Sequence, residues 1–264
     1  YCKANNSLIE HFGSNCIDFI PFKLQTKYEL KPNQIFVSVA SYRDDECTLT
    51  LRSIFKQADN PFNIIVGVCQ QNKNPDEQCE INIDPKFKTQ IRDITMDYTI
   101  AKGPTFARYL CASLWEGEEY FLQIDSHTNF NEHWDTDLIR MFKQCDSKKP
   151  ILTVYPPTQK QMEISGYPEM CNGKLGNNKI PTFMAGWASE SDKPTRCPKP
   201  FAAGGFMFLR GNFLEEVPYD PNLSHLFQGE ETLLSARLWT YGYDFYTPNI
   251  KTCWHNYGRP DKPK

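Results

Sequence analysis

The sequence predicts a single α/β domain with a mostly parallel central sheet flanked by helices. Its 264 residues are enough to bury one full core. Short apolar runs at 35–40 and 64–68 are typical of strands that are covered on both faces. Between these runs, Leu51, Ile54 and Phe55 recur at the spacing of an amphipathic helix. Strand, helix and strand in this order predict a βαβ unit.

The same alternation continues along the chain. Further strands are predicted at 91–96, 120–124, 151–155, 206–209 and 243–246. Further helices are predicted to open at Pro104, to carry Trp134, Leu138, Met141 and Phe142, and to carry Leu234, Leu238 and Tyr241. Residues 1–33 are interpreted as an N-terminal extension, 34–264 as one domain, and 158–200 as a loop-rich region within it.

Composition narrows the classes of partner and compartment. The 29 Lys and Arg against 32 Asp and Glu give a net charge of −3, so no positive field favours nucleic acid or an anionic membrane. No run of about 18 apolar residues predicts a membrane span. The ten cysteines include no CxxC pair, and Cys2/Cys16 and Cys171/Cys197 are plausible disulfides. This pattern favours an oxidising compartment, with buried free thiols as the alternative.

Polar residues at the carboxyl ends of the predicted strands are the first candidates for a site, because open parallel sheets bind ligands there. In an extended strand, Asp125 and His127 project to the same side and can bind one metal ion. A carboxylate with an imidazole suits Mn²⁺ better than Ca²⁺. The alternative is that these residues cap a helix or bond to a loop. His255 is a third candidate ligand, or else an interior histidine bonded to a carbonyl group.

Glu230 and Glu231 open a predicted helix, where the helix dipole favours carboxylates even without a function. Their side chains diverge by about 100°, so we expect Glu231 to face the substrate. Gly204 and Gly205 allow a ligand to approach the backbone, although a β-bulge is an equally simple interpretation.

Two basic residues lie at or near the start of the helix that opens at Pro104. Lys102 and Arg108 are placed where cations are useful near phosphates, with a solvated surface pair as the alternative.

Five separated segments resemble the GlcNAc family of retaining glycosyltransferases, over roughly residues 34–260. The segments are Ser38-Val39-Ala40-Ser41-Tyr42-Arg43-Asp44, Ala101-Lys102-Gly103-Pro104 with Ala107-Arg108-Tyr109, Leu122-Gln123-Ile124-Asp125-Ser126-His127, Val217-Pro218-Tyr219-Asp220, and 227–231. A more distant likeness to polypeptide GalNAc-transferases lies in Ala203-Gly204-Gly205, in Gly229-Glu230-Glu231 with Arg237 and Trp239, and in Asp-x-His with a later His. Thr105-Phe106 departs from the cysteine and tryptophan that are frequent in the family, and 158–200 matches it poorly.

The resemblance implies the GT-A nucleotide-diphosphosugar fold, a UDP-sugar donor and Mn²⁺ held by Asp125, His127 and His255. The nucleotide and sugar candidates that it adds are Ser41, Tyr42, Arg43 and Asp44 at the nucleotide, Lys102 and Arg108 near the nucleotide or diphosphate, and Gly204 and Gly205 under the sugar. Glu231, with Glu230 beside it, is the candidate catalytic residue next to the donor sugar or acceptor.

The function expected from the resemblance is Mn²⁺-dependent transfer of N-acetylglucosamine from UDP-GlcNAc to Ser, Thr or hydroxyproline of a protein, with retention of configuration. The alternatives are transfer of another UDP-hexose or UDP-hexosamine, or a non-catalytic protein that binds sugar nucleotide or carbohydrate. A glycosidase is disfavoured, because the adjacent Glu230 and Glu231 would not face each other across a sugar. The cysteine content slightly favours the Golgi lumen over the cytoplasm.

Overall fold

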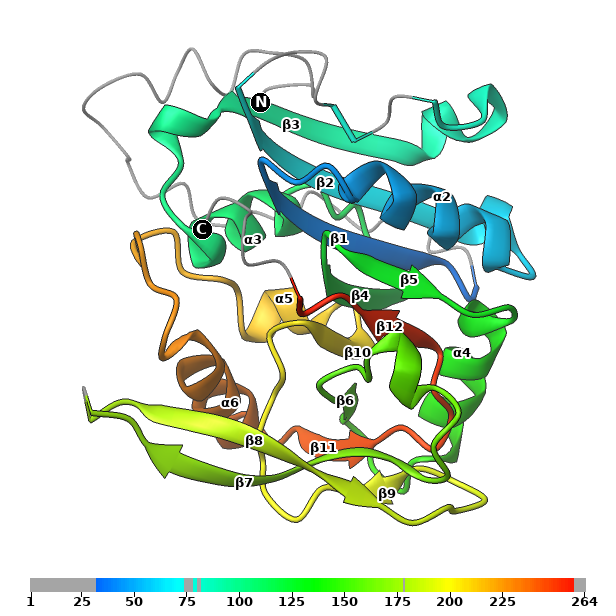
Figure 1. Ribbon diagram of the computed structural model, residues 1–264, viewed down its shortest axis with the longest axis vertical. Coiled ribbons are helices and arrows are strands. Elements are labelled where there is room, and N and C mark those ends of the chain that lie inside the picture. Colours follow the sequence, from blue (N-terminus) through cyan, green and yellow to red (C-terminus); the bar gives the residue numbers. More distant parts are fainter. Residues whose placement is uncertain (1–31, 74–77, 80–81, 178, 259–264) are drawn as a thin grey trace.

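The architecture is known from a computed structural model that describes residues 32–73, 78–79, 82–177 and 179–258. Its centre is an eight-stranded sheet with the order β3-β2-β1-β4-β10-β6-β11-β9 (Figure 1). The β1, β2, β3 and β4 strands pair in parallel, as do β6 and β11. The pairs of β10 with β4 and β6, and of β9 with β11, are antiparallel. The mostly parallel sheet is thereby confirmed.

The strands of this sheet are β1 (Ile35–Tyr42), β2 (Ile64–Asn72), β3 (Ile91–Asp97), β4 (Tyr120–Asp125), β6 (Pro150–Thr153), β9 (Thr195–Arg196), β10 (Phe206–Arg210) and β11 (Asp244–Thr247). Two small sheets pair β5 (Thr128–Phe130) with β12 (Cys253–His255), and β7 (Tyr167–Leu175) with β8 (Pro181–Ala188). The helices are α2 (Cys47–Gln57), α3 (Pro104–Ala112), α4 (Trp134–Gln144), α5 (Phe213–Glu216) and α6 (Glu230–Thr240). Short 3-10 turns are η1 (Pro61–Asn63), η3 (Pro85–Gln90), η4 (Tyr98–Ile100) and η5 (Gln159–Gln161).

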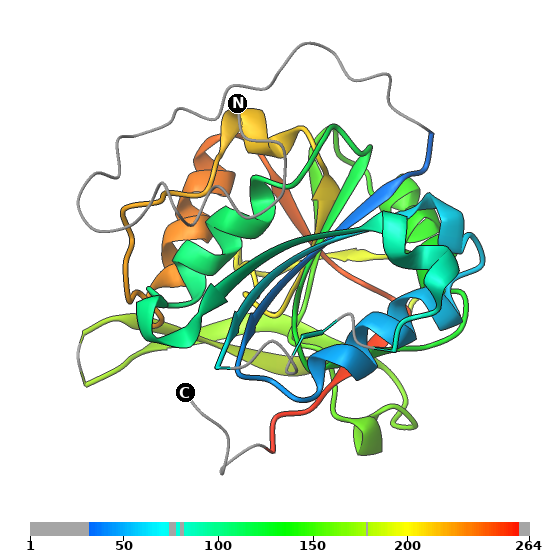
Figure 2. The ribbon, with the colours of Figure 1, turned by 90° about the horizontal axis from the view of Figure 1, so that it is seen from above.

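Helices cover both faces of the sheet. Figure 2 shows α2 and α4 on one side of the strands and α3, α5 and α6 on the other. Each face has its own apolar core, one containing Leu51 and Trp134 and the other containing Leu110 and Leu238. Alternate side chains of β1 enter the two cores, with Val37 on the first side and Phe36 on the second. This double burial explains why β1 is a nearly continuous apolar run.

Three predictions about local structure need correction. The strand that reaches Asp125 stops there, because Ser126 and His127 form a tight turn into β5. Tyr241 lies just beyond α6 and is 54% exposed, so of the three residues predicted to share the buried face only Leu234 and Leu238 are buried. The region 158–200 is not only loops, since it contains the long β7–β8 hairpin.

The cysteines also differ from the prediction. Cys47 and Cys79 form a disulfide that ties the first turn of α2 to the segment after β2. Cys171 and Cys197 are both free thiols, which contradicts their predicted pairing. The proposed Cys2–Cys16 pair and nearly all of the predicted extension at 1–33 lie outside the described residues. Among the helices that the structure does describe, none is long and apolar enough to cross a membrane.

Candidate metal and sugar-nucleotide site

Three predicted metal ligands converge at the carboxyl end of β4. Asp125 ends β4, His127 lies in the turn that follows, and His255 ends β12. One ligand atom from each side chain lies within 4.8 Å of the other two. The antiparallel pairing of β5 with β12 explains this, because it sets His255 opposite Thr128, the neighbour of His127. The structure therefore brings together residues that are 130 positions apart.

Asp44 orients His127. Its Oδ2 atom lies 2.8 Å from Nδ1 of His127 and accepts a hydrogen bond of 2.6 Å from the hydroxyl group of Ser126. Burial raises the pKa of Asp44, but the hydrogen bonds with His127 and Ser126 outweigh burial, and the net pKa is lowered. A carboxylate on one ring nitrogen fixes the tautomer of a metal-binding histidine and leaves the other nitrogen available. Predicted at the nucleotide, Asp44 is placed behind a metal-ligand candidate.

Arg108 is buried between two carboxylates and not exposed to solvent. Its Nη2 donates to Oδ1 of Asp125 at 3.1 Å, and its Nε forms an ion pair of 2.6 Å with Oε1 of Glu230. This second contact is an ion pair that does not meet the geometry of a hydrogen bond. Only 6% of Arg108 and 7% of Glu230 is exposed. Arg108, predicted near the nucleotide or diphosphate, thus links α3 to β4 and α6 in the structure.

The charge state of Asp125 suits a metal ligand. Burial raises its pKa, but the hydrogen bond with His255 and the charge of Arg108 together hold the pKa well below its usual range. The carboxylate is therefore ionised at neutral pH. A Cβ atom at Gly205 would lie 2.9 Å from Oδ2 of Asp125, so glycine keeps the space in front of that oxygen open. One carboxylate, two imidazoles and an open approach form a candidate site for a divalent metal ion.

The predicted Gly204 and Glu231 contact each other. The backbone N–H of Gly204 donates to Oε1 of Glu231 at 2.7 Å, and the hydroxyl group of Tyr155 donates to Oε2. Burial raises the pKa of Glu231, and these two hydrogen bonds only partly oppose it. Burial likewise raises the pKa of Glu230, which Arg108 opposes. Tyr155 was missed as a site residue, although its place after β6 follows the same strand-end rule.

The remaining nucleotide candidates surround the ends of β1, β2 and β3. Ser41 is fully buried, and its hydroxyl group has no hydrogen-bond partner among the described residues. Tyr42 ends β1, and Arg43 follows with a positive φ of 47°. The guanidinium group of Arg43 lies 4.7 Å from the ring centre of Tyr98, just after β3. These nucleotide candidates follow Ala40, which pairs with Asp125 across β1 and β4.

Lys102, unlike Arg108, makes its contacts with a neighbouring loop and an aromatic ring. Its carbonyl group accepts a hydrogen bond of 2.6 Å from the backbone N–H of His225, and its ammonium group lies 5.1 Å from the ring centre of Phe106. The adjacent Gly103 has a φ of 87°, and a Cβ atom there would lie 2.9 Å from Cα of His225. Lys102 and Gly103 therefore anchor the loop that leads to Glu230.

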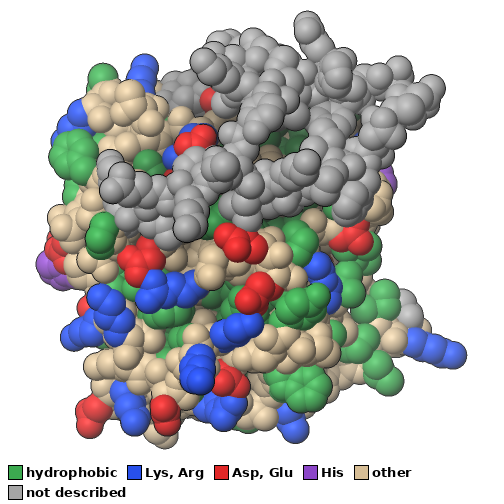
Figure 3. Space-filling model, turned by 180° about the vertical axis from the view of Figure 1, so that it is seen from behind, with side chains coloured by type: hydrophobic (Ala, Val, Ile, Leu, Met, Phe, Trp, Pro, Cys, Tyr) green, Lys and Arg blue, Asp and Glu red, His purple; other side chains and the backbone are tan. Residues whose placement is uncertain are grey.

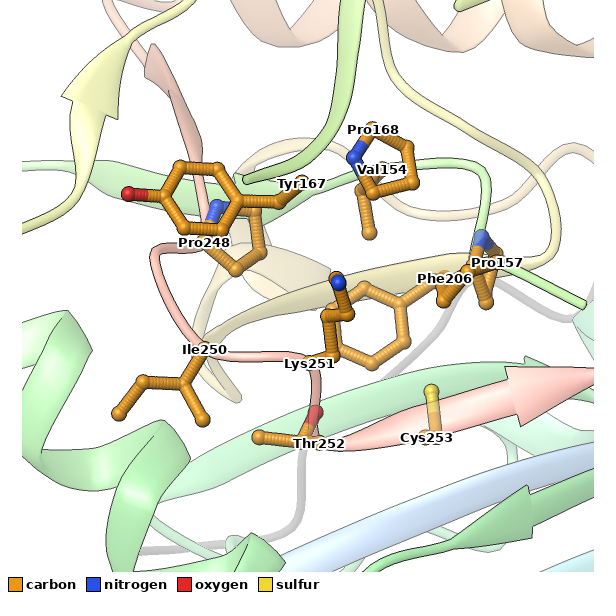
Figure 4. A pocket seen from close by; sticks show the side chains of 11 residues that line it. Val154, Pro157, Tyr167, Pro168, Phe206, Pro248, Ile250, Lys251, Thr252 and Cys253 are labelled. Carbon is orange, nitrogen blue, oxygen red and sulfur yellow. The ribbon is translucent and has the colours of Figure 1, made fainter. Parts of the chain in front are cut away.

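A small apolar pocket borders the site (Figure 4). It is lined by Val154, Pro156, Pro157, Tyr167, Pro168, Phe206, Pro248, Ile250, Lys251, Thr252 and Cys253. The carbonyl group of Pro157 accepts a hydrogen bond of 2.9 Å from the backbone of His255. Pro157 in the pocket wall thus helps to position His255, and the pocket offers few groups that could bind a nucleotide.

Figure 3 shows the molecule from behind the view of Figure 1. On the part of this face that is visible, acidic and basic side chains are interspersed, without a large patch of one sign.

Two solved structures define the class of this fold. The crystal structure of GalNAc-T7 with UDP, GalNAc and Mn²⁺ is 14% identical, with a TM-score of 0.61, and covers 88% of this chain. The crystal structure of S. aureus TarS 1-349 is 15% identical, with a TM-score of 0.54, and covers 84%. Both are glycosyltransferases of the GT-A fold. This chain spans 45% of the first chain and 60% of the second.

The family follows from the sequence itself. The family model described as "Glycosyltransferase (GlcNAc)" matches residues 34–86 and 83–264. The chain therefore belongs to the GlcNAc glycosyltransferase family, as its five segments predicted. A comparison with curated proteins finds no match.

Proposed function

We propose that this glycosyltransferase moves N-acetylglucosamine from UDP-GlcNAc to a hydroxyl group of a protein, on Ser, Thr or hydroxyproline, with Mn²⁺ as cofactor and with retention of configuration. The observation that carries the proposal is the convergence of Asp125, His127 and His255 at the carboxyl end of β4. The GalNAc-T7 crystal structure of the same fold contains UDP, GalNAc and Mn²⁺. Family membership supports the choice of sugar.

The residues around this group have separable roles in the proposal. Asp125, His127 and His255 would hold the ion, whose positive charge would neutralise the developing charge on the UDP leaving group. Asp44 sets the ring orientation of His127. Arg108 holds the carboxylate of Asp125 through Oδ1, while Oδ2 faces His255.

The sugar side of the proposed site is formed by Glu231 and the Gly204–Gly205 turn. Glu231 is partly exposed, so a substrate can reach its carboxylate group. The hydrogen bonds from Tyr155 and Gly204 fix both of its oxygens. A fixed acceptor of this kind can position a sugar hydroxyl or amide without reorganisation during the reaction.

A UDP-release assay over several UDP-sugars, with Mn²⁺ or with a chelator, tests this function. We expect release with UDP-GlcNAc and Mn²⁺, and loss of release by a factor of about 10² to 10³ in His127→Ala, from the loss of transition-state charge stabilisation. His133→Ala is the matched control, since His133 is an exposed histidine at the N-terminal end of α4 whose ring contacts Asp59. Equal release by His127→Ala and the parent would refute the metal role.

The same assay separates the alternative functions. Faster release with another UDP-hexose or UDP-hexosamine would replace the proposed donor. Binding of UDP without release from any donor would identify a non-catalytic binding protein. Mass analysis of candidate acceptor peptides then identifies the hydroxyl group that receives the sugar.

A further inference from the structure

The backbone turn at 202–205 is held almost entirely by side chains from other elements. Ala202 N–H donates to Oγ of Ser235 and Ala203 N–H to Oγ1 of Thr153, both at 2.8 Å. Gly204 N–H donates to Glu231, as described above. Buried backbone groups must find partners, and a turn without a neighbouring strand takes them from side chains. Each side chain therefore fixes one backbone position of this turn.

Gln123 supplies the tether on the carbonyl side. It lies on β4 two residues before Asp125, is fully buried, and its Nε2 donates to the carbonyl group of Gly204 at 2.7 Å. Its Oε1 accepts a hydrogen bond from the hydroxyl group of Tyr219. Only one orientation of the amide satisfies both contacts, because Nε2 must donate and Oε1 must accept. The carbonyl group of Gly204 can only accept, so it sets which way the Gln123 amide points, and the hydroxyl group of Tyr219 holds the oxygen end of that amide in place.

Tyr219 is itself firmly placed. It is 8% exposed, and its ring lies edge-on to Phe213 with centres 6.2 Å apart. The preceding carbonyl group, of Pro218, accepts a hydrogen bond of 2.7 Å from Arg237 on α6. This places the segment Val217-Pro218-Tyr219-Asp220, which the proposed function leaves without a role, behind the turn.

The turn forms the surface between the two parts of the candidate site. A Cβ atom at Gly205 would lie 2.9 Å from Asp125 Oδ2, and one at Gly204 would lie 3.4 Å from Glu231 Oε1. A displacement of the turn therefore changes the spacing between the metal-ligand carboxylate and Glu231. Misplacement of reacting groups by about 1 Å can reduce a rate by about a hundredfold.

We propose that Tyr219, acting through Gln123, is a positioning residue that fixes the Gly204–Gly205 turn between Asp125 and Glu231. The proposal rests on the proposed function for its effect on turnover, but the position of the turn is measurable without activity. Tyr219→Phe keeps the ring and its packing on Phe213 and removes only the hydroxyl group that holds Oε1 of Gln123 in place.

Two measurements on the purified chain test the proposal. In Tyr219→Phe we expect faster hydrogen exchange in a peptide that covers 202–206, and a kcat for sugar transfer that is lower by about tenfold to a hundredfold. The affinity for UDP with Mn²⁺ should change less than about twofold, because this substitution leaves the metal-ligand candidates in place. A change in UDP affinity as large as the change in kcat would overturn the positioning role.

Tyr243→Phe is the matched control, because Tyr243 is 5% exposed and its hydroxyl group donates to Glu216 at 3.0 Å. It should change neither exchange at 202–206 nor kcat. The pair Gln123→Met with Tyr219→Phe removes both partners and leaves no orphaned amide, and Tyr219→Phe should add almost nothing to the effect of Gln123→Met. Unchanged exchange in Tyr219→Phe, or multiplicative effects in the pair, would overturn the inference. If the parent transfers no sugar, the proposed function fails, and the exchange comparison still decides the inference.

Discussion

The first half of the fold, up to the end of β4 at Asp125, and the second half, from His127 onwards, are built in different ways. In the first half, parallel strands alternate with helical segments, and β1 pairs with β2 and β2 with β3, each with the next strand in the sequence. The second half depends on pairs distant in sequence, such as β10 with β4 and β12 with β5. The first half contributes Asp125 and the second half contributes His127, His255, Glu230 and Glu231. The first half thus forms the structural framework of the site, and the second half adds further candidate site residues to Asp125 at the end of β4.

The largest expected effect comes from Arg108, whose buried ion pair with Glu230 joins the two halves. Arg108→Met leaves the buried Glu230 and the partly exposed Asp125 without their cation, and breaking such a contact costs about 3 to 5 kcal/mol of unfolding free energy. Urea unfolding measures this loss, and a second substitution, Glu230→Gln, should restore part of it. Arg140→Met is the control, since Arg140 is an exposed partner of Asp137. Equal small losses in Arg108→Met and Arg140→Met would show that the halves do not depend on this contact.

The disulfide of the first half should affect stability and leave the site unchanged. Cys47 and Cys79 are 32 positions apart, so the chain-entropy model gives about 3 to 4 kcal/mol for the cross-link. Replacement of both by alanine should lower the unfolding free energy by that amount, without weakening Mn²⁺ affinity. A parallel loss of Mn²⁺ affinity, seen by calorimetry, would contradict the separation of framework and site.

Asp44 spans the boundary, because it follows β1 and contacts His127. Asp44→Asn should weaken Mn²⁺ binding by about tenfold to a hundredfold, the usual effect of losing a carboxylate behind a metal-binding histidine. Asp59→Asn is the control, because Asp59 makes the same kind of contact, at 2.7 Å, with the exposed His133. Unchanged Mn²⁺ affinity in Asp44→Asn would show that the contact of Asp44 with His127 does not contribute to metal binding.

The smallest expected effect lies at the periphery of the second half. Lys149, and to a lesser degree Tyr243, lower the pKa of Glu216 from its ordinary value of 4.5, against a smaller opposing effect of burial. A lowered pKa in the folded state adds stability above the ordinary pKa, and this stability is lost as pH falls through the folded pKa. Because the pair is exposed, its contribution is about 0.2 to 1 kcal/mol. Glu216→Gln should therefore lower stability at pH 7 and have no effect near pH 2, as measured by urea unfolding.

The sequence predicts the two halves unequally, for a physical reason. Apolar runs such as 35–40 and 64–68 identify β1 and β2, because burial on both faces leaves a local signal. The β7–β8 hairpin was missed, since β8 exposes Met184 and Trp187 and so lacks the pattern of a buried strand.

Within the candidate site, residue types and their order along the chain predicted the metal-ligand group. The contacts of the other candidate residues depend on tertiary packing and could not be predicted. For Arg108, predicted near the nucleotide or diphosphate, the sequence did not reveal the ion pairs with Asp125 and Glu230. The contacts of Asp44 with His127 and of Tyr219 with Gln123 join residues 83 and 96 positions apart. Local patterns carry no information about such pairs.

The most direct test of the account is calorimetric titration of Mn²⁺ into the parent, His127→Ala, His255→Ala and His133→Ala proteins. The account predicts binding by the parent and by His133→Ala, and a loss of affinity of at least about tenfold in both of the other variants. Mn²⁺ binding of equal strength in all four proteins would contradict the claim that the second half brings two metal-binding histidines to the end of β4.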